Sequence, residues 1–256
     1  MKNILITGAS SGLGEEFAHQ YAQEGITLFL CGRDIERLHT VAQSCRLKKA
    51  TVFVKAVDVT DRNKMKEWIL DITTHHGLDL IIANAGISGG FSGHEITAIE
   101  KDYLIFDTNV TGVLNTIYPA LPYMIQKRSG HIVIISSLAG YMPMPSAPAY
   151  AASKAAIRFY GEALRTKFAA FQVKVTVICP GFIKSRMTDS NDFPMPFLMD
   201  TSKAVQHMIN GINQGKAQIS FPWKLSIPLK ILSLFPSRLR SAFFAYLPDK
   251  KVLSND

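Results

Sequence analysis

Residues 3–14 read NILITGASSGLG, a short apolar run followed directly by a turn that contains three glycines. A tight glycine turn between a buried strand and a helix lets backbone N–H groups and the helix N-terminus face an anion. Gly8 permits the turn, Gly12 lets the backbone approach a pyrophosphate, and Gly14 allows close packing of the helix on the sheet. The spacing GxxxGxG differs from the commoner GxGxxG, and such turns also form for packing reasons alone. The stretch favours a dinucleotide-binding α/β fold without deciding it.

Short runs rich in β-branched residues alternate with longer segments of helical period along the chain. The expected strands are Asn3–Thr7, Thr27–Cys31, Thr51–Val57, Asp79–Ala83, His131–Ser136, Lys174–Cys179 and Gln218–Phe221. The expected helices are Leu13–Gln23, Ile35–Ser44, Asn63–Thr74, Lys101–Gln126, Ala151–Ala170 and Ser202–Asn213. Strands such as LIIA and IVII lack polar alternation, which indicates a parallel sheet covered by helices on both faces. No Pro- or Gly-rich linker divides residues 1–256, so we predict one α/β domain with a doubly wound, Rossmann-type sheet.

The composition excludes several classes of protein. The chain has 256 residues, 47% of them hydrophobic and 19% charged, which excludes intrinsic disorder and is sufficient for a large core. Cys31, Cys45 and Cys179 lie far apart without metal-ligand spacing, so we expect no zinc site, no disulfide framework and a reducing compartment. No apolar stretch approaches the ~18 residues of a transmembrane helix, and the first residues read as a strand and not as a signal peptide. We therefore expect a cytoplasmic protein, soluble or peripheral at the inner face of a membrane.

The tip of the second expected strand carries information about a nucleotide cofactor. In doubly wound folds an acidic residue at this tip selects a free ribose 2′-hydroxyl. Here Gly32 holds the tip and Arg33 follows it, and an arginine can pair with a 2′-phosphate. We assign Asp34 to the N-cap of the following helix and not to the ribose. The pattern favours NADP(H) over NAD(H), although Arg33 is also compatible with a solvated surface side chain.

A tyrosine and a lysine stand four residues apart in the stretch YAASKAAIRFY. That spacing places Tyr150 and Lys154 on one face of a helix, one turn apart. Ser136 and Ser137 end the strand HIVIISS, at the edge where open α/β sheets bind ligands. A lone YxxxK pair is common by chance, so the pair gains meaning only together with other motifs.

Five motifs, in matching order and spacing, make the sequence resemble the short-chain dehydrogenase/reductase (SDR) family over nearly its whole length. They are Thr7–Gly14 for TGxxxGxG, Asn84-Ala85-Gly86 for NAG, Asn109, Ser137 with Tyr150 and Lys154, and Pro180-Gly181. The family's serine lies thirteen residues before its tyrosine, which selects Ser137 over Ser136. The family often has a second Asn before NAG, where this chain has Ala83. The resemblance implies a seven-stranded sheet in the order 3-2-1-4-5-6-7 and a homodimer or homotetramer.

The resemblance also implies roles for four side chains. Tyr150 would be the acid/base, although a free tyrosine, with a pKa near 10, is a poor base at neutral pH. The ammonium of Lys154, together with the positive charge of oxidised nicotinamide, would lower that pKa, and Lys154 would also bind the nicotinamide ribose. Ser137 would stabilise the substrate oxygen, and Asn109 would hold a water that relays protons through Lys154.

Cofactor contacts are implied along the same edge of the sheet. They are Gly8, Ser10, Ser11, Gly12, Leu13, Gly14, Arg33, Asp58, Val59, Asn84, Ala85, Gly86, Tyr150, Lys154, Pro180, Gly181 and Ile183, with no metal. Asp58 is equally compatible with a plain turn or N-cap role in the sequence DVTD. The implied activity is hydride transfer between NADP(H) and a small-molecule carbonyl or secondary alcohol, with a hydrophobic substrate expected. The alternatives are an NADPH-binding regulator without turnover, against which the intact Ser-Tyr-Lys set argues, and an SDR epimerase.

Two segments fall outside the alternation of strands and helices. Residues 181–200 occupy the family's substrate-loop position, and their apolar side chains could form a lid or pack on the body. The side chains in question are Phe193, Met195, Phe197, Leu198 and Met199, and Tyr141 and residues 142–145 should edge the same pocket. Residues 222–256 are basic and apolar, which fits peripheral contact with an anionic membrane, an oligomer interface or a helix that caps the substrate mouth. The net charge of +8 has no nucleic-acid recognition motif beside it, so nucleic acid is disfavoured.

Overall fold

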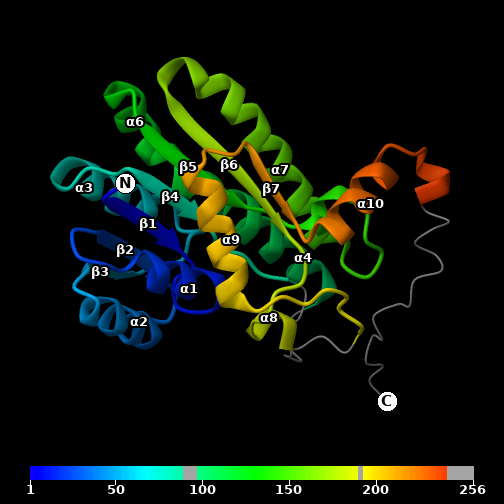
Figure 1. Ribbon diagram of the computed structural model, residues 1–256, viewed down its shortest axis with the longest axis horizontal. Coiled ribbons are helices and arrows are strands. Elements are labelled where there is room, and N and C mark those ends of the chain that lie inside the picture. The colour runs from blue at the N-terminus through cyan, green and yellow to red at the C-terminus, as the bar shows by residue number, and fades with distance from the viewer. Residues whose placement is uncertain (89–96, 190–192, 241–256) are drawn as a thin grey trace.

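Seven parallel strands form one sheet in the order β3-β2-β1-β4-β5-β6-β7 (Figure 1). The structure is a computed structural model that describes residues 1–88, 97–189 and 193–240. The strands are β1 (Asn3–Thr7), β2 (Thr27–Gly32), β3 (Thr51–Ala56), β4 (Leu80–Ala83), β5 (Gly130–Ile135), β6 (Val173–Pro180) and β7 (Gln218–Phe221). The predicted doubly wound sheet and its strand order are confirmed, and every strand end lies within one residue of its expected place.

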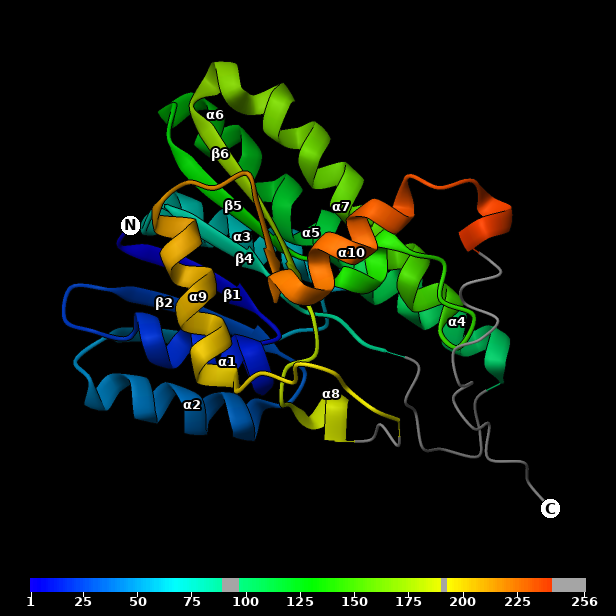
Figure 2. The same cartoon turned by 45° about the vertical axis from the view of Figure 1, so that its right-hand side comes forward.

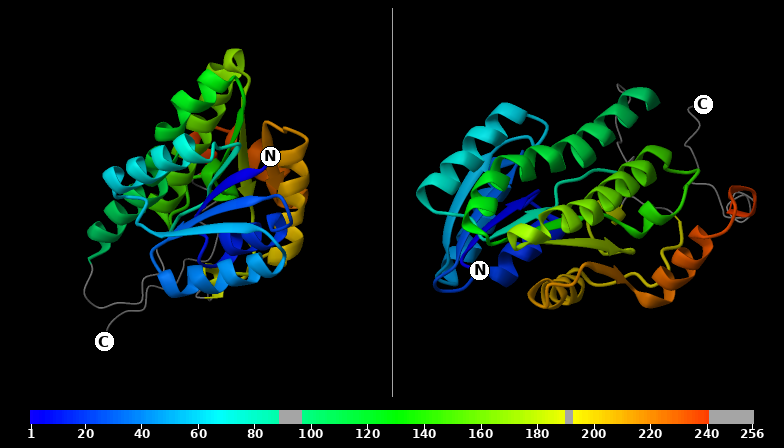
Figure 3. Two further views of the ribbon diagram at one scale, coloured as in Figure 1. Left: turned by 90° about the vertical axis from the view of Figure 1, so that its left-hand side faces the viewer. Right: turned by 90° about the horizontal axis from the view of Figure 1, so that it is seen from above.

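Helices cover both faces of the sheet, because successive strand residues point to opposite sides. Ile4 and Ile6 lie in a buried cluster with Phe17 of α1, whereas Leu5 between them joins a second cluster with Met65 of α3. The first cluster lies under α1 (Gly12–Tyr21), α2 (Ile35–Leu47) and α9 (Thr201–Asn213), and the second under α3 (Arg62–His75), α5 (Gly112–Ile117) and α7 (Pro148–Phe168). Figure 3 shows the sheet between these two helical layers. This double burial explains why the strands are apolar throughout.

The single helix expected over residues 101–126 is wrong in detail. The chain forms α4 (Ala98–Phe106), a π-helical turn (Asp107–Thr111), α5, a 3₁₀ turn (Tyr118–Ala120) and α6 (Leu121–Lys127). The start lies earlier because Thr97 and Glu100 form a reciprocal capping box. The 3₁₀ turn coincides with Pro119, which has no N–H for an α-helical hydrogen bond. The π-helical turn places Asn109 in the interior, next to the site described below.

Two further helices lie outside the six expected ones, although a helix that caps the substrate mouth was one of the three interpretations of residues 222–256. α8 (Arg186–Asp189) is a single turn within the loop after β6, and α10 (Trp223–Ser233) follows β7 directly. α10 contains Pro228, which costs one backbone hydrogen bond, but the helix is held by Leu225 and Leu229 against the body. Among the described residues, no helix has the length and apolar content required to cross a membrane.

Candidate active site

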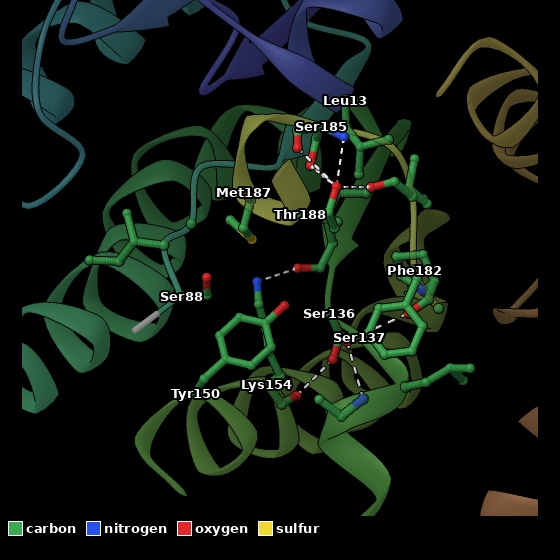
Figure 4. Close-up of a pocket in the computed structure, with 18 of the residues that line it drawn as sticks. Leu13, Ser88, Ser136, Ser137, Tyr150, Lys154, Phe182, Ser185, Met187 and Thr188 are labelled. Carbon is green, nitrogen blue, oxygen red and sulfur yellow. Dashed lines mark hydrogen bonds between the residues drawn. The ribbon is translucent and has the colours of Figure 1, made fainter. Parts of the chain in front are cut away.

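A cavity of about 1250 Å³ opens at the carboxyl ends of the strands. It is lined by the glycine turn between β1 and α1, by the ends of β4, β5 and β6, and by side chains of α7 and α10. Figure 4 shows part of its wall, with Tyr150 and Lys154 projecting from α7 and Ser185, Met187 and Thr188 on the opposite side. The topology therefore places the two halves of the predicted site in one space.

The glycine turn has the conformation that only small residues allow. Gly8 has φ +66°, and an added Cβ would lie 2.9 Å from the Cα of Ala85. A Cβ on Gly14 would collide with the carbonyl oxygen of Gly8, so this contact between helix and turn requires glycine. An added Cβ at Gly12, with φ +59°, would meet nothing nearer than Ser185 at 3.7 Å, which leaves the turn open toward the cavity.

The first turn of α1 can receive an anion. Its N-cap residue Ser11 makes no side-chain hydrogen bond to the helix, so the first N–H groups have no partner from that cap. Gly12 and Leu13 lie in the cavity wall at this point. The partial positive charge of the helix N-terminus and the open glycine cradle therefore fit a pyrophosphate.

Thr7 ties this turn to the loop after β4. Its hydroxyl accepts hydrogen bonds from the backbone N–H groups of Asn84 and Ala85, both at 3.1 Å. The Asn84 side chain returns a bond of 2.9 Å to the Thr7 carbonyl. Asn84, Ala85 and Gly86 all line the cavity. The two loops thus form one rigid floor under the candidate cofactor site.

The tip of β2 contributes a basic side chain to the cavity wall. Gly32 and Arg33 line the cavity, and the Oγ of Ser10 lies 3.1 Å from the position of an added Gly32 Cβ. Asp34 caps α2 by accepting a hydrogen bond from the N–H of Arg37, as predicted, and also pairs with the Arg37 guanidinium at 2.9 Å. Its carboxylate is therefore engaged by the helix start, and Arg33 is the charged residue of the tip that lines the cavity.

Asp58 both stabilises a turn and lies at the cavity, the two roles that the sequence analysis left open. Its Oδ1 accepts bonds from the N–H and hydroxyl of Thr60, at 2.9 and 2.8 Å, which is a turn role. Asp58 and Val59 also line the cavity. The turn therefore holds this pair in place at the end of the cavity that lies near β2.

Tyr150 and Lys154 lie within one helix, because α7 begins at Pro148 and not at the expected Ala151. Burial raises the pKa of the Tyr150 phenol, and a hydrogen bond with the Ser137 hydroxyl opposes that rise. Burial lowers the pKa of the Lys154 ammonium to about 8. The sequence led us to expect a lowered tyrosine pKa, but desolvation by the protein dominates and raises it.

The two serines at the end of β5 have different surroundings. The Ser136 hydroxyl donates to the main-chain carbonyl of Lys154 at 2.7 Å, so it fixes β5 to α7. The Ser137 hydroxyl accepts from the N–H of Ala139 at 3.1 Å and faces the Tyr150 phenol. The arrangement favours Ser137 as the serine available to a substrate oxygen.

Lys154 and Asn109 are held by the protein on either side of Gly86. The Lys154 Nζ donates to the Ile135 carbonyl at 3.0 Å. The Asn109 Oδ1 accepts from the Ile87 N–H at 2.8 Å, and its Nδ2 donates to Ile87 and Ser153. A Cβ on Gly86 would lie 3.1 Å from both the Lys154 Nζ and the Asn109 Oδ1. Glycine at this position therefore leaves a small polar space between the amide and the ammonium.

One part of the loop after β6 lines the cavity, and another part packs on the body of the protein. Phe193 lines the cavity and contacts Phe182 edge to face, with ring centroids 6.0 Å apart. Met199 packs on the core and is fixed to the body by a hydrogen bond from its N–H to the Phe182 carbonyl. Phe197 and Leu198 are exposed. The expected lid thus reduces to the part of the loop around Phe193.

α10 forms part of the cavity wall. Leu225, Leu229 and Leu232 line the cavity, which matches the interpretation of the tail as a cap over the substrate mouth. Tyr141 was expected at the pocket edge, but it is packed with Leu225 and Leu229 and bonds to Ser220 at 3.1 Å, whereas Met142 and Met144 do line the cavity. Residues 241–256 of the tail lie outside the described residues.

Several lining residues were missed by the sequence reasoning. They are Ile87, Ser88 and Thr108 beside the NAG turn, and Ser185 and Thr188 after Pro180-Gly181. The Thr188 hydroxyl accepts from the N–H of Ser185 at 2.8 Å and donates to a main-chain carbonyl of the same loop. The available signal was a pair of hydroxyl residues shortly after Pro180-Gly181, a position that the parallel sheet brings to the same edge.

The chain is similar to known proteins over most of its length. Residues 2–194 match the family model described as short chain dehydrogenase. An uncharacterized oxidoreductase of Myxococcus xanthus is 40% identical over 242 residues, which cover 94% of this chain and 95% of that protein. The 11-beta-hydroxysteroid dehydrogenase-like 2 of Arabidopsis thaliana is 36% identical over 86% of this chain and 73% of its own length. A short-chain dehydrogenase from Sphingobium yanoikuyae, solved in complex with NADPH, superposes with a TM-score of 0.80 at 22% identity, over 100% of this chain and 99% of its own.

Proposed function

Since the chain belongs to the short-chain dehydrogenase family, we propose that it is an NADP(H)-dependent carbonyl reductase or alcohol dehydrogenase for bulky hydrophobic substrates. The family membership makes it an oxidoreductase that acts on CH–OH or C=O groups. The observation that carries the proposal is the meeting of Ser137, Tyr150 and Lys154 with the glycine turn in one cavity.

The preference for NADP(H) rests on Arg33. The guanidinium stays charged at all physiological pH values and can bind a phosphate through two N–H groups. Gly32 supplies no carboxylate to select a free 2′-hydroxyl, and Asp34 is engaged by the start of α2. We therefore propose that Arg33 binds the 2′-phosphate, while Ser10, Ser11, Gly12 and the first turn of α1 bind the pyrophosphate.

The chain's own part in the reaction is proton transfer and alignment. When bound, NADPH supplies a hydride to the carbonyl carbon, and NADP⁺ accepts one from the carbinol carbon. In reduction, the Tyr150 phenol donates its proton to the substrate oxygen, and the Ser137 hydroxyl bonds to the same oxygen as charge develops on it. The Lys154 ammonium stabilises the resulting phenolate and binds the nicotinamide ribose. A water between Asn109 and Lys154, in the space that Gly86 leaves, would return a proton to Tyr150 from solvent.

The expected substrate class follows from the far end of the cavity. Seven uncharged side chains contribute to its wall, which also includes Arg186: Met142, Met144, Phe182, Phe193, Leu225, Leu229 and Leu232. A ketone or secondary alcohol with a large apolar body would bury its surface there, at about 25 cal/mol for each Å² removed from water. The name of the Arabidopsis relative, a hydroxysteroid dehydrogenase-like protein, supports a bulky hydrophobic substrate.

Self-association is part of the same proposal. Tyr103, Tyr118 and Phe159 are exposed aromatic side chains on or beside α4, α5 and α7. Large exposed aromatic side chains are compatible with a contact between subunits. We propose a homodimer or homotetramer, which light scattering of the purified chain would measure.

Replacing the phenol tests the proposed mechanism. Tyr150→Phe should reduce carbonyl turnover at least about 100-fold, because the proton donor is lost, and should leave NADPH binding by fluorescence titration nearly unchanged. The matched control is Tyr160→Phe, the same change on the same helix at a residue outside the cavity. Full activity in Tyr150→Phe would refute the assigned role.

A further inference from the structure

The outward face of α10 is apolar although it faces solvent. Trp223, Ile227, Ile231 and Leu234 stand at helical spacing on one side and are 66%, 49%, 53% and 84% exposed. The opposite side, with Leu225 and Leu229, packs on the body. An apolar helix face that is exposed to water is unfavourable. We therefore expect a second apolar surface to cover the outer face of α10. Figure 2, where α10 is labelled, and Figure 3 show this helix on the outside of the molecule, where an apolar partner can reach it.

The segment of the chain that carries this face has charges of one sign. From residue 201 to residue 240 the sequence contains Lys and Arg but no Asp or Glu. Lys224 and Arg238 are exposed at the two ends of the face. The Lys224 Nζ lies 5.9 Å from the ring centroids of both Trp223 and Phe197, and Phe197 is itself exposed. An apolar strip with an exposed tryptophan and basic ends is complementary to an anionic lipid surface.

The same face borders the mouth of the cavity. Ile231 and Phe235 are about half exposed, and both also line the cavity. Leu232 lies between them and lines the cavity as well. An apolar molecule in a lipid layer in contact with this face would therefore enter the cavity without crossing water. This continuity distinguishes the α10 face from exposed apolar residues such as Leu47 on α2, which is absent from the cavity wall.

We propose that the outer face of α10 docks on an anionic lipid surface and that hydrophobic substrate enters the cavity from the lipid. The docking surface consists of Trp223, Ile227, Ile231 and Leu234, with Lys224 and Arg238 at its ends. The side chains insert to the depth of the headgroups, and the helix lies parallel to the surface. This goes beyond the proposed reaction, because it assigns a partner to a surface that takes no part in proton transfer.

Vesicle co-sedimentation of the full chain tests the proposal without using enzyme activity. The protein should bind vesicles of equal parts phosphatidylcholine and phosphatidylglycerol more tightly than vesicles of phosphatidylcholine alone. Ile227→Ser with Leu234→Ser should weaken binding about 100-fold, because each side chain moved from water into lipid contributes about tenfold. Both residues are outside the cavity wall, so turnover of a water-soluble ketone should be unchanged. The matched control is Leu47→Ser with Leu70→Ser, two exposed leucines on α2 and α3, which should bind vesicles like the parent chain.

A second pair of variants tests the charge complementarity. Lys224→Gln with Arg238→Gln should weaken binding to the anionic vesicles about 25-fold, because each basic residue near such a surface contributes about fivefold. Binding to vesicles of phosphatidylcholine alone should not change. Lys55→Gln with Lys66→Gln removes the same charge from β3 and α3 and should have no effect beyond about twofold.

Three outcomes would overturn the proposal. They are equal binding of the parent chain and both α10 variants, equal loss in the control variants, and absence of binding to either kind of vesicle. If Ile227→Ser with Leu234→Ser instead converts an oligomer to a smaller species in light scattering while the parent ignores vesicles, the face is a contact between copies of the chain. Unchanged thermal melting of each variant establishes that a loss of binding is not a loss of fold.

Discussion

Raising the pH from 7 to 9 should remove most of the activity, because Lys154 loses its proton. Lys154 is 5% exposed, and burial lowers the pKa of its ammonium from 10.5 to about 8. The pKa of the Tyr150 phenol moves the other way and is raised by burial, so the phenol keeps its proton over this range. The proposed role of Lys154, stabilising the phenolate that forms as Tyr150 gives up its proton, requires the charged form. We therefore assign the expected loss of activity at alkaline pH to the deprotonation of Lys154.

The magnitude follows from that pKa. With a pKa of about 8, about 90% of Lys154 is charged at pH 7 and about 10% at pH 9, so the rate should fall about tenfold. The quantity to measure is kcat/KM for NADPH, which reports the titration of the free enzyme. A deprotonation that inhibits gives a rate that is flat below pH 7 and falls tenfold per pH unit well above pH 8.

Lys154→Arg supplies the control, because a guanidinium stays charged throughout this range. The larger head group should lower the absolute rate, but the fall between pH 7 and pH 9 should disappear. The reasoning is refuted if the parent enzyme holds its kcat/KM to pH 9. An equal fall in Lys154→Arg would show that a different group titrates.

Two further predictions concern the cofactor and stability in acid. Arg33→Ala should raise KM for NADPH about tenfold, through loss of one charge-assisted contact at an exposed site, and leave KM for NADH unchanged. An unaltered ratio of the two KM values would show that Arg33 does not bind the 2′-phosphate. Burial lowers the pKa of His131 to about 4, and its Nε2 bonds to the Thr176 hydroxyl at 2.8 Å. In the unfolded chain the histidine has a pKa of about 6.5, so it is protonated before the folded protein as the pH falls from 7 to 4. Protonation of this group should therefore lower the free energy of unfolding by about 3 kcal/mol. In urea titrations, the free energy of unfolding of His131→Asn should lose about 3 kcal/mol less than that of the parent protein between pH 7 and pH 4. An equal loss in both proteins would contradict the role of His131.

The framework of the fold was predictable because its signals are local. Apolar strands without polar alternation specify a sheet buried on both faces, and the βα repetition specifies parallel pairing. The N-cap role of Asp34 could be assigned for the same reason, since a cap depends on the next three residues alone. The capping box of Thr97 and Glu100 also depends on neighbouring residues alone, so the earlier start of α4 is equally a local feature of the sequence.

The details that sequence reasoning missed depend on contacts between distant segments. Whether an apolar side chain becomes a lid or part of the core depends on what lies opposite, which is why Phe193 and Met199 have different surroundings although both belong to one apolar loop. The sequence left three interpretations of residues 222–256 open, and the packing of Leu225 and Leu229 on the body favours the helix that caps the cavity although Pro228 interrupts its hydrogen bonding. The direction of the Tyr150 pKa shift likewise depends on the burial that the whole cavity produces.

The most direct test of the central claim follows a labelled hydride. NADPH carrying deuterium at the transferable position of the nicotinamide is incubated with the enzyme and a panel of bulky hydrophobic ketones, and the alcohols formed are examined by mass spectrometry and NMR. We predict deuterium on the carbinol carbon with the parent enzyme and with Tyr160→Phe, and at least about 100-fold less with Tyr150→Phe. Tight binding of NADPH without label transfer to any ketone, or equal transfer by Tyr150→Phe, would contradict the account.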